Sequence, residues 1–171
     1  QDATYWNFFP TKDACTVWLA FSDVTAASGA IQYSLGSHKS SQLDHTDVAA
    51  EQNLLMRGQT VSANIEPASL TVAELPAGSV TIHSPYIIHG SQSNTTAAPR
   101  LACGMIFATG TVKPIATFAP ESTLWVAGED KHGYMLHDPV PTGAWQDNLQ
   151  AWRLAYDRQH ENYYKMKVNA A

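Results

Sequence analysis

Short apolar runs, each ended by Gly, Pro, Ser or Asp, recur along most of this 171-residue chain. Runs of this kind are typical of the short strands of a mainly β domain. We predict strands at residues 4–8, 15–22, 30–35, 69–74, 79–83, 86–89 and 101–109. The chain length fits one domain with a sizeable core. We therefore expect residues 1–171 to form a single domain.

Side-chain alternation predicts which face of a strand packs and which can meet a ligand. In 15–22 the odd positions form a continuous apolar face, whereas the even positions, with Trp18, are mixed. In 101–109 one face carries small residues such as Gly104 beside the preceding Arg100. The small side chains on that face leave room for an anion inside a barrel. They equally fit a narrow barrel whose interior is filled by small and large side chains in turn. The pattern does not choose between the two.

The C-terminal part of the chain has a different period. Apolar side chains spaced by three, four and seven residues predict a helix near 143–165, with an apolar stripe that we expect to be packed. The segment 44–61 is polar and without period, which predicts a long loop of the kind that often acts as a lid. The stripe consists of Trp145, Leu149, Trp152, Tyr156 and Tyr163.

Charge and composition exclude several classes of protein. The net charge of -5 gives no basic footprint for nucleic acid, and no apolar run is long enough to span a membrane. Cys15 and Cys103 lie in apolar runs, which favours buried free thiols over a disulfide. Free thiols fit a reducing compartment, so we predict a cytoplasmic protein.

Three residues point to chemistry. His89 is followed eleven residues later by Arg100, and Asp2 stands near the start of the chain. Two His and one carboxylate with open positions form the facial arrangement of non-haem Fe(II) oxygenases. Taken singly, each residue has a simpler interpretation: a structural histidine, a solvated carboxylate and a surface ion pair.

Five segments in a fixed order extend this pattern. They are Gln1-Asp2 followed by Tyr5-Trp6, the Trp of Thr-Val-Trp-Leu-Ala at 16–20, Ala-Ser-Gly-Ala-Ile-Gln at 27–32, Gly-Ser-His-Lys at 36–39, and His-Gly-Ser-x-x-Asn at 89–94 followed by Arg100. Together they make the chain resemble, over nearly its whole length, the phytanoyl-CoA hydroxylase (phytanoyl-CoA dioxygenase) family of Fe(II)/2-oxoglutarate-dependent oxygenases.

The resemblance implies a double-stranded β-helix, a cupin-like jelly roll, with a C-terminal helix. It implies Fe(II) as cofactor, 2-oxoglutarate as cosubstrate, and O₂ and a small organic molecule as the other reactants. The implied reaction is hydroxylation, because related halogenases replace the carboxylate at the position of Asp2 with a small residue.

The resemblance also assigns residues. Asp2 and His89 would ligate iron, and Arg100 would pair with the distal carboxylate of 2-oxoglutarate, a task that suits its planar fork. Trp18 and Ser91 would help to form the cosubstrate pocket. The other histidines, including His45 and His83, are interpreted as surface or structural residues. Positions that would support the site or touch substrate are Gln1, Thr16, Asn94 and His38.

One departure from the family pattern concerns the metal. The family's triplet is His-Gln-Asp, whereas this sequence begins with Gln1-Asp2 and also lacks the family's N-terminal region. We therefore expect two protein ligands, weak iron binding and poor or no turnover.

Two alternatives to the oxygenase stay open. One is a catalytically silent jelly roll that binds a small anion or sugar. The other is a cupin that uses a different metal, such as an isomerase. Dependence of turnover on 2-oxoglutarate would separate the latter from an oxygenase.

Overall fold

The computed structural model describes residues 1–48, 58–115 and 122–168, and of Asp47, Ser122 and residues 162–168 it describes the backbone alone. Its internal contacts divide the chain into two compact units. The first joins Gln1–Thr4 to Ala14–Phe107, and the second joins Tyr5–Asp13 to Ala108–Ala171. The expectation of one domain over 1–171 therefore stays a prediction.

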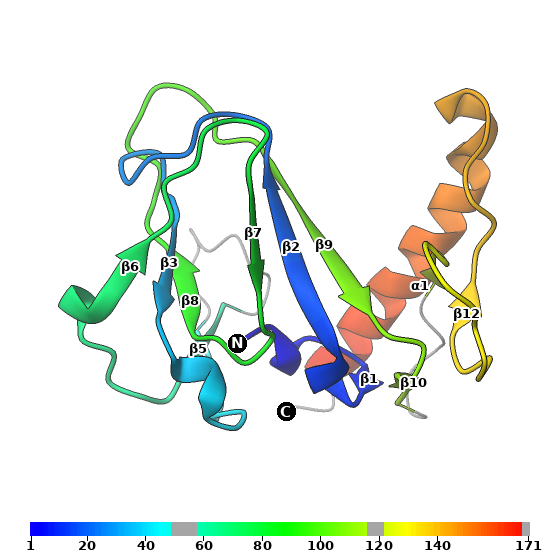
Figure 1. Ribbon diagram of the computed structural model, residues 1–171, viewed down its shortest axis with the longest axis horizontal. Coiled ribbons are helices and arrows are strands. Elements are labelled where there is room, and N and C mark those ends of the chain that lie inside the picture. Colours follow the sequence, from blue (N-terminus) through cyan, green and yellow to red (C-terminus); the bar gives the residue numbers. More distant parts are fainter. Residues whose placement is uncertain (49–57, 116–121, 169–171) are drawn as a thin grey trace. The chain divides into compact units, whose positions relative to one another are not determined.

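Two three-stranded sheets form the first unit (Figure 1). In one, β2 (Ala14–Ala20) lies between β7 (Val80–His83) and β9 (Ala102–Ala108). In the other, β3 (Ile31–Ser34) lies between β6 (Leu70–Val72) and β8 (His89–Ser91). The β2–β7, β3–β6 and β3–β8 pairs are antiparallel. The fold is thus mainly β, as the sequence predicts.

The register of these strands sets the position of the site. Thr16 of β2 stands opposite His83 of β7, and Tyr33 of β3 stands opposite His89 of β8. Two small buried clusters lie on the inner faces, and Trp18 packs against both. The mixed face of β2 therefore points inward, as the alternation of 15–22 indicates.

Several predicted strands occur with shorter bounds, but three segments differ from the prediction. Residues 4–8 are mostly not a strand, because the Thr4 amide donates to Gln1 O (3.3 Å) and closes the 3-10 turn η1 (Asp2–Thr4). The predicted loop 44–61 contains an antiparallel pair, β4 (His45–Asp47) and β5 (Gln59–Val61), while 49–57 lies outside the described residues. The predicted strand 86–89 shares only His89 with β8.

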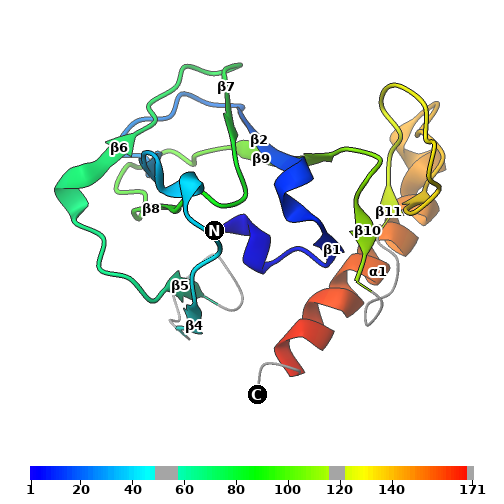
Figure 2. The ribbon, with the colours of Figure 1, turned by 60° about the horizontal axis from the view of Figure 1, so that its bottom comes forward.

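The second unit contains two short sheets and the long helix (Figure 2). β1 (Phe8–Phe9) pairs antiparallel with β10 (Lys113–Pro114), and β11 (Ser122–Thr123) pairs parallel with β12 (Leu136–His137). The helix α1 spans Leu149–Val168 after a 3-10 turn at Trp145–Asn148. The other 3-10 turns are Thr11–Asp13, Ser37–Lys39 and Pro67–Ser69.

The C-terminal helix is confirmed, but the packing of its stripe is not. Trp145 is 68% exposed, Trp152 58% and Tyr156 48%. Instead of meeting a core, the Trp152, Tyr156 and His160 rings stack on one another along the helix. The Tyr163 side chain lies outside the described part of the chain.

Two further expectations can be compared with the structure. Cys15 and Cys103 are both free thiols, but each is half-buried where the sequence favoured full burial. Within the described residues, no helix has the length and apolar character needed to cross a membrane.

Candidate metal centre and cosubstrate site

Three side chains from different elements of the first unit converge on one point. They are Asp2 in η1, His83 at the end of β7 and His89 at the start of β8. Asp2 Oδ2 lies 3.3 Å from His83 Nε2, and Asp2 Oδ1 lies 3.3 Å from His89 Nε2. The ligand atoms of all three residues lie within 4.8 Å of one another. This is the spacing of ligands around one metal ion.

The other ring nitrogens of both histidines are already engaged. His89 Nδ1 lies 3.0 Å from Ile87 O, which can only accept, so Nδ1 carries the proton. His83 Nδ1 lies 3.0 Å from the Tyr33 hydroxyl, which in turn lies 3.0 Å from Thr81 Oγ1. Partners of this kind fix the tautomer and ring orientation of metal-ligating histidines. Both Nε2 atoms therefore face Asp2.

This arrangement calls for a cation. His83 is only 8% exposed, and its Nε2 makes no hydrogen bond despite its 3.3 Å approach to Asp2. Burial opposes ionisation of the Asp2 carboxyl. The neighbouring His83, His89 and Thr16 groups outweigh this effect and hold the pKa of Asp2 well below its usual range. A carboxylate facing buried imidazole nitrogens needs a proton or a metal ion between them.

The carboxylate has a further support on β2. The Thr16 hydroxyl donates to Asp2 Oδ2 at 2.6 Å. Thr16 was a predicted supporting residue, whereas Tyr33 and Thr81 were not anticipated. All three side chains come from the inner faces of the sheets, so the strands themselves position the cluster.

His83 is the main residue that the sequence reasoning missed. It was interpreted as structural, and the chain was expected to offer two metal ligands. The structure brings a second imidazole, that of His83, to Asp2, so these three side chains could hold one metal ion. The number of metal ligands stays a prediction. A signal was present: in β7 the polar Thr81 and His83 alternate with the apolar Val80 and Ile82, which marks an inward polar face opposite Thr16.

Two of the three residues predicted to hold 2-oxoglutarate, Arg100 and Trp18, lie together. The Arg100 guanidinium stands over the Trp18 ring, 5.5 Å from its centroid, and donates to Gly29 O. Trp18 follows Thr16 by two residues on the same face of β2, which corresponds to about 7 Å along a strand. Gly104 is also close, since a Cβ there would lie 3.9 Å from the Trp18 ring.

Gly29 fits closely beneath this pair. Its φ is 81°, and a Cβ at this position would lie 2.6 Å from Gln92 O. Only glycine combines such a backbone angle with such a close approach.

The remaining predicted residues divide into two groups. Gln1 is buried, and its side chain donates to Tyr86 O (2.7 Å) and accepts from the Leu43 amide (2.9 Å). Asn94 bonds within its own loop, to Ala98 O and the Thr96 amide, and His38 is exposed on a 3-10 turn. The structure does not bring these last two residues to the cluster.

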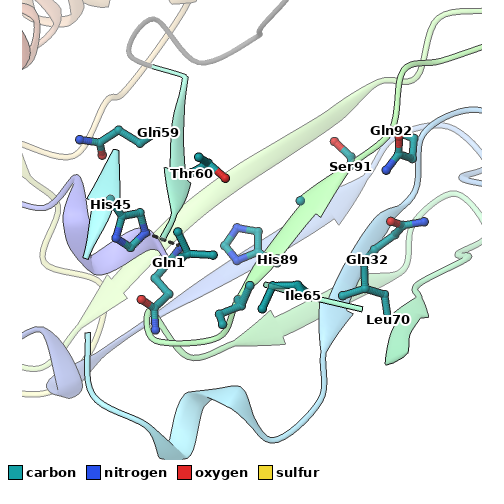
Figure 3. A pocket seen from close by; sticks show the side chains of 13 residues that line it. Gln1, Gln32, His45, Gln59, Thr60, Ile65, Leu70, His89, Ser91 and Gln92 are labelled. Atoms are coloured by element: carbon teal, nitrogen blue, oxygen red, sulfur yellow. Dashed lines mark hydrogen bonds between the residues drawn. The ribbon is translucent and has the colours of Figure 1, made fainter. Parts of the chain in front are cut away.

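A cavity of about 250 Å³ lies beside His89 within the first unit. Figure 3 shows Gln59 and Thr60 of β5 on one side of His89, and Gln32, Ser91 and Gln92 on the other. The predicted residues Gln1 and Ser91 line it. His45, predicted to be a surface histidine, lines it as well and is half-buried. The other lining residues are Val61, Ile65, Leu70, Ile88 and Gly90.

Comparison with known proteins agrees with this geometry. Residues 1–102 match the phytanoyl-CoA dioxygenase (PhyH) family. The chain belongs to this family. The resemblance read from the sequence is thereby confirmed. No curated protein sequence matches the chain.

Two solved structures of the enzyme ThoJ are similar to this chain in sequence and in fold. The apo form of the non-heme monooxygenase ThoJ is 28% identical, with a TM-score of 0.83 over 99% of this chain and 60% of ThoJ. The ThoJ–Ni complex is 25% identical, with a TM-score of 0.72 over 97% of this chain and 58% of that one. The chain thus spans about 60% of the length of ThoJ.

A third structure shows the fold alone. It is the epimerase SnoN in complex with Fe3+, alpha ketoglutarate and nogalamycin RO. SnoN is 24% identical, with a TM-score of 0.53 over 66% of this chain and 42% of that one.

Proposed function

We propose that the protein is an Fe(II)/2-oxoglutarate-dependent oxygenase that hydroxylates a small organic substrate on a double-stranded β-helix scaffold. In the balanced reaction, a substrate C–H bond, 2-oxoglutarate and O₂ give the alcohol, succinate and CO₂. One oxygen atom enters the alcohol and the other enters succinate, and the electrons come from the C–H bond and from the decarboxylation.

The convergence of Asp2, His83 and His89 carries this proposal. Two ligands at about 2.1–2.2 Å from a metal and at right angles are about 3 Å apart, close to the 3.3 Å seen on each side of Asp2. Imidazole and carboxylate suit Fe(II), and three ligands on one face leave positions open. The orphaned Nε2 of His83 fits a metal ligand better than a structural histidine.

Relatives support the choice of metal and cosubstrate. ThoJ is a non-heme monooxygenase with a nickel complex, and residues 1–102 match the phytanoyl-CoA dioxygenase family. In this chain Arg100 would bind the distal carboxylate of 2-oxoglutarate, and Trp18 would wall that pocket and exclude water. Fe(II) with 2-oxoglutarate would supply the oxidising power for attack on a C–H bond.

An anaerobic titration of the full chain with Fe(II) tests the proposal. We expect one ion per chain, and a visible charge-transfer band that appears only after 2-oxoglutarate is added. Admission of O₂ should then form succinate. Asp2→Asn should lose the metal and the band, whereas Asp147→Asn, a matched change on an exposed turn of the second unit, should keep both. A chain without metal binding or succinate formation would be a silent jelly-roll binder instead.

A further inference from the structure

We propose that Thr16 is a positioning residue that holds one oxygen of the Asp2 carboxylate and leaves the other oxygen to bind the metal. The inference rests on the proposed function and deepens it, because it assigns the way in which Asp2 would bind the ion. Three observations carry it: the anchoring of the backbone beside Asp2, the short hydrogen bond from Thr16, and the different surroundings of the two carboxylate oxygens.

The backbone beside Asp2 is anchored to the segment that joins β7 to β8. The Ala3 amide donates to Pro85 O at 3.1 Å, and the side chain of Pro85 is fully buried. Because this segment runs from His83 to His89, the anchor sets η1 close to both imidazoles. It does not set the orientation of the Asp2 carboxylate, since the outer torsion of an aspartate side chain has only broad, roughly two-fold preferences.

Thr16 supplies this orientation from a different strand. It lies on the inner face of β2, is only 9% exposed, and donates its hydroxyl proton to Asp2 Oδ2 at 2.6 Å. This distance is typical of a charge-assisted O–H···O⁻ bond, which is roughly twice as strong as a bond between neutral groups. The Thr16 hydroxyl has no other hydrogen-bond partner in the described part of the chain. Turning the carboxylate away would therefore leave a buried hydroxyl unsatisfied, which is costly.

The two oxygens of Asp2 thus have different surroundings. Oδ2 accepts the Thr16 bond and lies 3.3 Å from His83 Nε2. Oδ1 lies 3.3 Å from His89 Nε2 and accepts from no hydroxyl or amide of the described residues. Oδ1 can therefore face a metal ion while the Thr16 bond stays intact. Binding through both oxygens would compete with that bond and would take up one of the positions that the other reactants need.

Binding of Co(II) to the full chain tests the inference without turnover. Thr16→Val keeps the branched shape of the side chain but removes the hydroxyl, whereas Thr16→Ser keeps the hydroxyl. We expect Thr16→Val to lower the Co(II) affinity by about tenfold, as for other losses of a ligand's outer partner, and Thr16→Ser to retain the wild-type affinity. Thr111→Val is the matched control, because the Thr111 hydroxyl donates to Asp13 Oδ2 at 2.8 Å in the second unit.

Infrared difference spectra show how the carboxylate binds. Subtracting the spectrum of the metal-free chain from that of the Co(II)-bound chain isolates the carboxylate that changes on binding. Its antisymmetric and symmetric stretches lie further apart when one oxygen binds than when both do. We expect the wide separation in the wild-type, Thr16→Ser and Thr111→Val chains, and a narrower one in Thr16→Val. A merely structural role of Thr16 would lower the affinity of Thr16→Val without changing this separation.

The outcomes separate this inference from the proposed function. Urea unfolding checks that each variant is folded, and Thr16→Ala replaces Thr16→Val if the valine chain is not. If the hydroxyl-free variant keeps the wide separation, or if the wild type shows the narrow one, the inference is overturned and the oxygenase proposal stands. A wild-type chain that binds no Co(II) or Fe(II) would reject the oxygenase proposal, and the positioning role of Thr16 with it.

Discussion

Two Asp–His clusters lie in different units of the chain, and within the described residues only the one at Asp2 brings together three groups that could hold a metal ion. Asp130 in the second unit contacts His137 Nε2 at 3.0 Å, much as Asp2 contacts His83 and His89. However, Asp130 Oδ1 also accepts two backbone amides, from His132 and Gly133, at 2.9 Å each. His137 Nδ1 lies 2.7 Å from the Thr123 hydroxyl.

The clusters differ in the number of histidines, two at Asp2 and one at Asp130, and in whether the polar atoms have hydrogen-bond partners. Around Asp130 every polar atom named above has a protein partner, so the cluster is complete as a brace between β12 and the preceding turn. Around Asp2, two imidazole nitrogens face one carboxylate, and one of them lacks a hydrogen bond. A metal site is therefore recognised by what its ligands leave unpaired.

The largest expected effect is on metal binding. His83→Gln should lower Fe(II) affinity by more than about 100-fold, because removal of a ligand should exceed the 10–100-fold cost of losing an outer partner. His137→Gln should leave the affinity unchanged. Anaerobic titration followed by calorimetry measures both. Equal affinities for the wild type and His83→Gln would show that His83 is not a ligand.

Loss of the partner of His83 should have a smaller effect. Tyr33→Phe keeps the ring in its buried cluster but removes the hydroxyl that holds His83 Nδ1. We expect iron affinity to fall by about tenfold. The electronic spectrum of the Co(II)-substituted chain should also change, which a purely structural role would not cause. Thr123→Val, which removes the hydroxyl partner of His137, is the matched change in the second unit.

Arg100→Lys should weaken the binding of 2-oxoglutarate and leave the affinity for Fe(II) unchanged. A lysine keeps the charge but loses the planar fork, so we expect the 2-oxoglutarate Kd to rise by about tenfold. The charge-transfer band measures this Kd directly. Arg158→Lys is the control, since Arg158 pairs with both oxygens of Asp138 in the second unit. An unchanged Kd in Arg100→Lys would remove Arg100 from the cosubstrate site.

The smallest expected effect is a pH dependence in the complete cluster. Hydrogen bonds from the Gly133 and His132 amides, together with His137, lower the pKa of Asp130 from 3.8 to about 2. A carboxyl group whose pKa is lower in the folded state stabilises the fold at pH values above its unfolded-state pKa. This stabilisation is lost as the pH falls through the folded-state pKa. The stability difference between wild type and Asp130→Asn should thus shrink from pH 4 to pH 2. Urea unfolding followed by tryptophan fluorescence measures it, and a constant difference would exclude this linkage.

The inner faces of the strands were the most predictable part of the molecule. Alternation in 15–22 set Trp18 on the face that can meet a ligand, and alternation in 101–109 set Arg100 on the face with the small residues. In the structure β2 and β9 are neighbouring strands, and the Arg100 guanidinium stands over the Trp18 ring. The resemblance supplied Asp2 and His89. Periodicity works here because a strand has two faces and a packed sheet leaves each a different environment.

The parts that were missed depend on partners that no local pattern encodes. Alternation in β7 marks the face of His83 as polar, but the partner of that face follows from the pairing of β7 with β2, which sets His83 opposite Thr16. The pair β4–β5 has neither alternation nor apolar character, because its residues line a polar cavity. The apolar stripe on α1 has the spacing of a helix, but this spacing does not show whether another part of the protein packs against the stripe. Trp152 is 58% exposed.

Gly29 limits how this protein can diversify. Gln32 and Gln92 line the cavity beside His89, and their side chains make no hydrogen bond in the described structure, so substitutions there break no such contact. Position 29 accepts only glycine, since any Cβ there would collide with Gln92 O. The collision would displace the Gly29 carbonyl, which accepts a hydrogen bond from Arg100. A saturation library selected for 2-oxoglutarate binding should therefore return many residues at position 32 and only glycine at position 29. New specificities would arise around a fixed cosubstrate anchor.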